Sequence, residues 1–247
     1  MDKNIQRKTI IGFCLLTCIL CQNIFGQTEN DYRNPKLPVE ERVNDLLSKM
    51  SLEEKVRQMD MYKGEFFVEG QDFSLEKAKN KIGNLGVGAI HDLYPESANT
   101  INELQRFVID SNRWGIPALI MEEMLHGYMA EGSTAFPMNI GLGATWDTEL
   151  LKKVGEVIGT EARAHGVHFG LGPNLDIGLE PRWGRIAETF GEDVYLAGEL
   201  GTAMVQGLQG ESLASNRSII AEPKHFAVHG IPQAGGNSSP TLVGERA

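Results

Sequence analysis

Three places in the sequence bring together side chains that can bind a polar ligand. Residues 180–185 (EPRWGR) hold two arginines and a tryptophan beside proline and glycine, a composition that predicts a rigid loop. Lys224 and His225 are adjacent, and Glu123 follows a short apolar run. A carboxylate, an ammonium, an imidazole and a guanidinium beside an aromatic ring can together bind a neutral ligand rich in hydroxyl groups, as sugars are.

Residues 180–185 also allow purely structural roles. Either arginine can pair with a nearby acid, namely Glu188, Glu192 or Asp193. Trp183 can fill a gap in the core instead of binding a ligand. In the functional alternative, an arginine donates to hydroxyl oxygens while the indole of Trp183 offers a sugar-sized face.

Other motifs argue against cofactors. The glycine clusters at residues 83–88, 141–143 and 170–173 lack the spacing of a dinucleotide fingerprint, and none is a phosphate-binding loop ending in Gly-Lys-Ser/Thr. Glu161, His165 and His168 resemble a metal cluster in spacing, but the first two lie in a predicted helix and His168 in the following strand. We therefore expect neither a cofactor nor a metal site.

The elements that position these residues follow an alternating pattern. Short apolar runs occur at residues 87–90, 118–121, 167–171 and 219–221. Amphipathic stretches between them predict helices at residues 97–113, 148–165 and 193–208. This alternation predicts an α/β fold with a mostly parallel sheet, for which we count four strands. Polar residues follow each run, so a shared pocket is expected at the carboxyl ends of the strands.

Two further helices are predicted ahead of this pattern. Residues 38–50 carry apolar side chains at helical spacing. Ser51 and Glu54 form a capping box that begins a second helix, with Leu52, Val56 and Met59 on its expected buried face.

The N-terminus predicts export. A basic start, about a dozen apolar residues and a small residue before Gln27 are typical of a signal peptide over residues 1–26, which a short polar linker follows at 27–34. The apolar run is too short to span a membrane. All three cysteines lie in this leader, so the exported part has none, and lipid anchoring is not expected. The predicted location is the periplasm or the medium.

The charge balance excludes one class of partner. The chain carries 33 acidic and 23 basic residues, for a net charge of −10 that becomes −12 without the leader. No basic stripe is available to neutralise a phosphate backbone, so nucleic acid is excluded as a partner.

Several stretches resemble the N-terminal region of glycoside hydrolase family 3, the exo-acting β-glucosidases and β-xylosidases. They occur in the order of the family at residues 42–59, 116–127, 136–137, 141–147, 181–188, 190–193 and 224–226. The resemblance implies that residues 35–247 are the N-terminal part of a (β/α)8 TIM-type barrel, incomplete in this chain. It also implies hydrolysis of terminal non-reducing β-linked sugars by a retaining mechanism, with a small oligosaccharide or aryl β-glycoside as substrate.

The resemblance implies roles for single residues. Glu123, Arg185, Lys224 and His225 resemble the residues that bind the terminal sugar. Trp183 and Asp176 correspond to wall and scaffold, and His126 to a residue that orients its loop. The nucleophilic aspartate and the acid/base of the family are expected beyond Ala247, so this chain supplies the sugar-binding half and is expected to be inactive alone.

The identity of the sugar stays open. Many members carry an arginine about a dozen residues after the lysine, where this chain has residues 235–237 (GGN). The alternatives are a β-xylosidase or α-arabinofuranosidase activity of the parent protein, or an inactive sugar-binding remnant. The N-acetylglucosaminidase branch is disfavoured, because residues 231–247 contain neither Asp nor His.

Overall fold

The structure is a computed structural model, described here over residues 31–94 and 97–244. The predicted signal peptide and the first four residues of the predicted linker lie outside the described residues. The chain divides into two compact units, residues 1–55 and 56–247. In the described part, no helix is both long enough and apolar enough to cross a membrane.

The first unit contains helix α2 (Val39–Lys49), after which helix α3 (Leu52–Arg57) begins. The capping box is confirmed: the Ser51 amide donates to Glu54 Oε2 at 2.8 Å, and the Glu54 amide donates to Ser51 Oγ at 3.2 Å. Residue Tyr32 of the predicted linker contacts α2, because its amide donates to Asp45 Oδ2 at 2.9 Å.

The expected burial of the apolar face of the second helix is wrong. Leu52 and Met59 are each 78% exposed, and Val56 is also exposed. On α2, Val43 and Leu47 are exposed as well. Helical spacing identifies which face is apolar, but burial also needs an opposing surface, which spacing does not specify.

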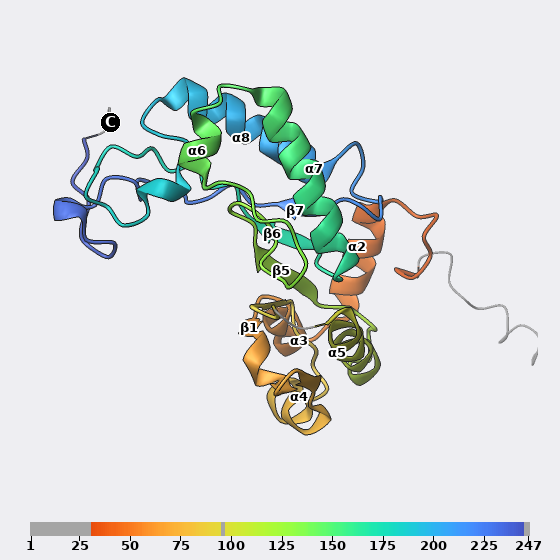
Figure 1. Cartoon of the computed structure of the whole chain (residues 1–247). Coiled ribbons are helices and arrows are strands. Elements are labelled where there is room, and N and C mark those ends of the chain that lie inside the picture. Colours follow the sequence, from red (N-terminus) through yellow and green to blue (C-terminus); the bar gives the residue numbers. More distant parts are fainter. Residues whose placement is uncertain (1–30, 95–96, 245–247) are drawn as a thin grey trace, which may run out of the picture. The chain divides into compact units, whose positions relative to one another are not determined.

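The second unit is built on a parallel sheet of five strands, β1 (Met61–Lys63), β4 (Ala89–His91), β5 (Leu119–Glu123), β6 (Phe169–Leu171) and β7 (Ile220–Ala221). Their spatial order, β1-β4-β5-β6-β7, follows the order of the sequence, and every neighbouring pair is parallel. Figure 1 labels β1, β5, β6 and β7 of this sheet. The four predicted runs are confirmed as strands. The count of four is wrong, because β1 pairs with β4 although its three residues form no apolar run.

Helices connect the strands. They are α4 (Leu75–Ile82), α5 (Ala98–Ser111), α6 (Asn139–Gly143), α7 (Thr148–Ala164) and α8 (Val194–Gln209). A hairpin of β2 (Val68–Glu69) and β3 (Asp72–Phe73) precedes α4. Ser97, Asp147 and Asp193 cap α5, α7 and α8 by accepting from an amide three residues on, which confirms the three predicted helix starts.

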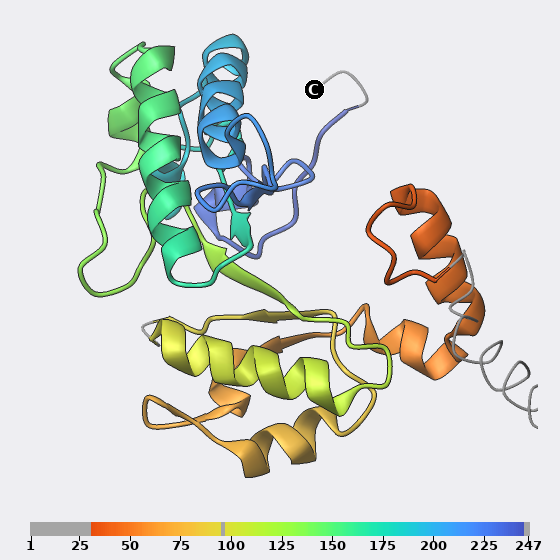
Figure 2. The same cartoon turned by 90° about the vertical axis from the view of Figure 1, so that its right-hand side faces the viewer.

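Helices α7 and α8 lie side by side in both views (Figures 1 and 2). Buried Leu151 and Ile158 on α7 and Leu200 and Met204 on α8 contribute to the core. Glycine allows the close approach: a Cβ at Gly207 would strike the carbonyl oxygen of Lys152 and lie 2.9 Å from Gly155 Cα. This pair of helices forms the connections on either side of β6, whose carboxyl end carries part of the candidate site.

Candidate functional site

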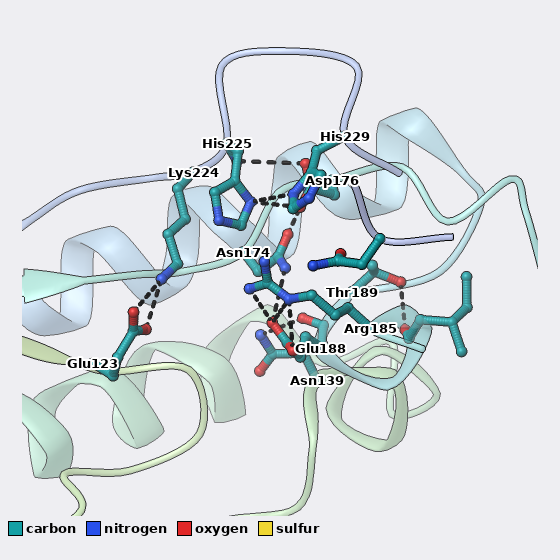
Figure 3. Close-up of polar contacts among 12 residues, drawn as sticks. Glu123, Asn139, Asn174, Asp176, Arg185, Glu188, Thr189, Lys224, His225 and His229 are labelled. Atoms are coloured by element: carbon teal, nitrogen blue, oxygen red, sulfur yellow. Dashed lines mark hydrogen bonds and ion pairs between the residues drawn. The ribbon is translucent and has the colours of Figure 1, made fainter. Parts of the chain in front are cut away.

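Lys224 and Glu123 form an ion pair across the sheet. Glu123 is the last residue of β5, and Lys224 follows the end of β7 by three residues. Lys224 Nζ donates to Glu123 Oε1 at 2.8 Å and to Oε2 at 2.6 Å (Figure 3). The lysine side chain is only 11% exposed, whereas the carboxylate is partly open to solvent. The pair therefore presents unused oxygen lone pairs and a buried cation at one point.

The backbone of residues 173–175 holds Lys224 in place. The Lys224 amide donates to the Pro173 carbonyl at 3.0 Å, and the Leu175 amide donates to the Lys224 carbonyl at 2.6 Å. Asn174 and Lys224 form a parallel bridge beyond the ends of β6 and β7. The position of the lysine is thus set by backbone pairing that continues the sheet.

His225 is oriented by a buried carboxylate. Its Nδ1 lies 2.7 Å from Asp176 Oδ2, and the Asp176 side chain is 1% exposed. A carboxylate can only accept, so Nδ1–H is the donor, which leaves Nε2 for another partner. Asp176 in turn is fixed by its own amide, which donates to Asn174 Oδ1 at 2.8 Å. The scaffold role of Asp176 is consistent with this contact.

Arg185 pairs with Glu188, one of the three acids considered for it. Its Nε lies 2.9 Å from Oε1 and its second guanidinium nitrogen 2.6 Å from Oε2. Burial alone would raise the pKa of Glu188, but the hydrogen bond and charge of Arg185, with smaller effects of Asn174 and Lys224, hold that pKa below its usual value. The hydrogen bond to Glu188 also raises the pKa of Arg185. Both groups are therefore ionised, and the guanidinium keeps N–H groups for a further acceptor.

The four predicted residues gather at the carboxyl ends of the strands, as Figure 3 shows for Glu123, Arg185, Lys224 and His225. The same view includes Glu188, which binds Arg185, and Asp176, which binds His225. Asn174 hydrogen-bonds to both of these acidic residues. Each cation of this group has an acidic partner, Glu123 for Lys224 and Glu188 for Arg185. Each cation still keeps N–H groups that can donate to a ligand.

The other residues of the 180–185 loop are structural. Trp183 is 1% exposed, and its Nε1 donates to Asn237 Oδ1 at 2.8 Å, so the interpretation of its indole as an exposed sugar face is wrong. The indole fills a gap, as the structural alternative has it. Arg182 binds Glu180 at the surface. The composition of the loop does not separate the two arginines, because both flank the tryptophan, whereas the family resemblance selects Arg185.

His126 acts on its own loop. Its Nδ1 lies 2.9 Å from the carbonyl oxygen of Phe136, the only partner recorded for its side chain among the described residues. This contact is consistent with the loop-orienting role expected for it.

Sequence reasoning missed Glu122, which lies beside Glu123 in β5. Its Oε1 accepts from the Leu93 amide at 2.6 Å, and its side chain is buried. Burial raises the pKa of Glu122 to about 8, against the lowering effect of the backbone hydrogen bonds. The alternation of side chains along a strand was the available signal: if Glu123 faces the site, Glu122 points to the opposite side.

Sequence reasoning also missed the place of His229 in this group. Its Nδ1 lies 3.1 Å from His225 Nδ1 and 3.5 Å from Asp176 Oδ2. Over residues 31–94 and 97–244, these three side chains are the group of His, Cys, Asp or Glu that could hold a metal ion. Glu161 and His168, considered earlier, have other partners: Thr134 and the Ile120 amide.

Comparison with known proteins identifies the family to which this chain belongs. The pattern of the family described as Glycosyl hydrolase family 3 N terminal domain matches residues 51–243. The chain belongs to this family, as its sequence motifs predict.

Three similar proteins give the family membership more detail. A protein of Formosa agariphila that bears the provisional name β-xylosidase is 37% identical over 98% of this chain and 34% of its own length. The periplasmic β-glucosidase of Salmonella typhimurium is 33% identical over 87% of this chain and 26% of its own length. The chain thus spans between about a quarter and a third of these relatives.

The third similar protein is known from a solved structure, that of a D270A mutant β-glucosidase from Listeria innocua in complex with laminaribiose. It superposes with a TM-score of 0.74 at 32% identity, covering 84% of this chain and 29% of that one. The expected fold is therefore confirmed: the α/β unit is part of a TIM-type barrel.

Proposed function

We propose that this chain binds the terminal non-reducing sugar of a β-linked substrate, and that the whole protein hydrolyses that linkage by a β-glucosidase-like retaining mechanism. Glu123, Arg185, Lys224 and His225 are the proposed sugar-binding residues. The carboxylate nucleophile and the acid/base of such a mechanism are assigned to no residue of this chain. A small oligosaccharide or an aryl β-glycoside is the proposed substrate.

The ion pair of Lys224 and Glu123 is the observation that carries the proposal. A free sugar hydroxyl donates one hydrogen bond and accepts others, so it fits a site with an acceptor and a donor side by side. Glu123 offers the acceptor and Lys224 the donor within 2.8 Å of each other. Neighbouring hydroxyls on a pyranose ring can bind to both groups at once.

Arg185 and His225 extend this site. Arg185 keeps guanidinium N–H groups beyond those bound to Glu188, and His225 keeps Nε2 beyond its contact with Asp176. Charge-assisted hydrogen bonds to such groups are each worth about 1.5–3 kcal/mol. Several of them together are enough to bind one monosaccharide unit and to orient its anomeric carbon.

Two alternatives concern the identity of the sugar and the role of the chain. The first is a β-xylosidase or α-arabinofuranosidase activity of the parent, and the name of the Formosa relative supports its β-xylosidase form. In the other alternative, the chain is an inactive sugar-binding remnant. Both alternatives keep the same four binding residues. The preferred substrate separates the first from the main proposal, and the absence of turnover separates the second.

Export to the periplasm or the medium belongs to the same proposal. The periplasmic relative from Salmonella supports it, as does the predicted leader over residues 1–26. Export can be tested by determining the N-terminal sequence of the protein purified from its native host. A mature N-terminus at Gln27 is expected, and an intact Met1 would contradict cleavage of the leader.

Calorimetric titration with glucose and xylose tests sugar binding, and the two arginines of the 180–185 loop provide a matched pair. Arg185→Ala should lower the affinity at least about tenfold, because it removes charge-assisted donors. Arg182→Ala should leave the affinity unchanged, since Arg182 binds Glu180 at the surface. Equal effects of the two variants would contradict the assignment. Release of glucose or xylose from aryl β-glycosides by the whole protein would then separate the hydrolase from the remnant.

A further inference from the structure

The cluster of Asp176, His225 and His229 has a geometry that the sugar-binding proposal does not require. Both histidines turn Nδ1 toward the same oxygen, Asp176 Oδ2, at 2.7 and 3.5 Å (Figure 3). The two Nδ1 atoms lie 3.1 Å apart, and the rings stand nearly perpendicular at 83°. Three potential ligand atoms therefore converge on one point.

We propose that Asp176 Oδ2, His225 Nδ1 and His229 Nδ1 form a binding site for a divalent transition metal ion of the zinc type. Imidazole nitrogen and carboxylate oxygen are ligands of such ions, at about 2.0–2.2 Å from the metal. Three protein ligands of this kind leave one coordination position of a tetrahedral ion for water or another group.

The distances match this use with a small separation of Asp176 Oδ2 from His225 Nδ1. A triangle with edges of 2.7, 3.1 and 3.5 Å fits inside a circle of radius about 1.8 Å. A point roughly 1 Å above its plane lies about 2.1 Å from all three atoms, which is the bond length that zinc needs.

The charges around the cluster favour a cation. Each of the neighbouring basic residues has its own carboxylate, Lys224 with Glu123 and Arg185 with Glu188. The ion pairs recorded for Asp176 in the described part of the chain are to the two imidazoles. Its buried carboxylate therefore remains available to balance a bound ion, as a charge buried in protein requires.

The surroundings hold the ligands while leaving one side open. The ring of His229 packs edge-on against that of Trp183, with 5.0 Å between the ring centroids. The indole is in turn held by the hydrogen bond that its Nε1 donates to Asn237 Oδ1. His225 and His229 also line a cavity together with Phe226, Val228 and Thr241. This cavity gives an ion access to both imidazole ligands.

Metal binding changes the tautomer of His225. Nδ1 gives up the proton that it now donates to Asp176 and Nε2 takes one up from solvent, so the imidazole stays neutral and the Nδ1 lone pair binds the metal. The Nε2 of His225 is not a ligand in this arrangement, so the proposed contact to sugar is retained. Affinity for the metal should fall as the pH is lowered, because protons compete for the imidazoles.

Titration of the purified chain with Zn²⁺, after EDTA treatment and dialysis, tests the site. Cys14, Cys18 and Cys21 are first alkylated so that their thiols cannot compete. We expect one saturable ion per chain, and Co²⁺ at the same site should give visible d–d bands of four-coordinate strength. The absence of saturable binding at millimolar Zn²⁺ would overturn the proposal.

Matched variants separate this site from casual binding. His229→Phe keeps an aromatic ring against Trp183 but removes the ligand, and should weaken binding at least about tenfold and abolish the Co²⁺ bands. Asp176→Asn should act in the same direction, with near-UV circular dichroism to verify folding. His165→Gln removes a histidine elsewhere and should change nothing. Binding that survives His229→Phe, or that falls equally in His165→Gln, would overturn the proposal.

Discussion

Lys224 Nζ lies 2.6 Å from Glu123 Oε2, although 101 residues separate the two in the sequence. The pair connects the carboxyl end of β5 to the segment after β7, across β6. Backbone pairing of Lys224 with residues 173–175 fixes the lysine, and the end of β5 fixes the acid. The sheet therefore creates the contact, and the two side chains then offer a donor and an acceptor to one ligand.

The first prediction concerns this pair. Lys224→Met and Glu123→Gln should each weaken glucose binding at least about tenfold, because each removes a charge-assisted hydrogen bond. The double variant should lose less than the sum, with a coupling energy of about 1–3 kcal/mol, since the first change already breaks the pair. Calorimetric titration of the four proteins measures this cycle, and strict additivity would show that the two residues act independently.

The second prediction concerns pH and Glu122. The folded-state pKa is about 8, against an ordinary value of 4.5. Below about pH 4.5 both folded and unfolded chains keep the proton. Between there and pH 8 the unfolded chain loses it first, so folding is progressively destabilised, and above pH 8 the loss is complete. Glu122→Gln should remove this loss. The free energy of unfolding of the variant, relative to that of the native chain, should therefore rise by about 2–4 kcal/mol from pH 5 to pH 9.

Urea unfolding of the native chain and of Glu122→Gln, at pH 5 and at pH 9, measures this change in stability. Glu131→Gln, which changes an exposed acid on the loop after β5, is the control and should show no such gain. A pH dependence of stability that is identical in native protein and Glu122→Gln would contradict the buried, protonated carboxyl.

The third prediction concerns the contact of α7 with α8. Gly207→Ala introduces a Cβ that strikes the Lys152 carbonyl, and the backbone cannot move away without separating the helices. We expect a loss of about 1–3 kcal/mol in the free energy of unfolding. Gly198→Ala on the same helix meets nothing within 4 Å and should instead stabilise by about 0.5–1 kcal/mol. Thermal unfolding of the two variants compares them, and effects of the same sign would contradict the packing argument.

The fourth prediction concerns the capping box of α3. Ser51→Ala removes the acceptor for the Glu54 amide and should cost about 0.5–2 kcal/mol of local helix stability. Amide hydrogen exchange over residues 52–57 is the measurement, because a short helix can open without global unfolding. Ser48→Ala is the control, since the Ser48 hydroxyl donates to the Asp45 carbonyl on an exposed helix face. Equally fast exchange of residues 52–57 in Ser48→Ala would contradict the capping role of Ser51.

Local features were predictable because their causes are local. The capping residues Ser97, Asp147 and Asp193 start helices where the sequence predicts them, since each needs only an amide three residues away. The family motifs likewise identify Glu123, Arg185, Lys224 and His225 as candidates. What the sequence could not predict was β1, whose pairing with β4 depends on a neighbour and not on its own hydrophobicity.

The sequence by itself thus determined the fold class, the helix starts and the four residues proposed to bind a hydroxyl-rich ligand, because residue type, short-range spacing and family motifs carry that information. Only the tertiary structure decided which arginine pairs with Glu188, that Trp183 is buried, and that His229 joins His225 at Asp176. These relations depend on strands and loops distant in the chain meeting at one edge of a sheet. No local pattern records such a meeting, since it is set by how the whole unit packs.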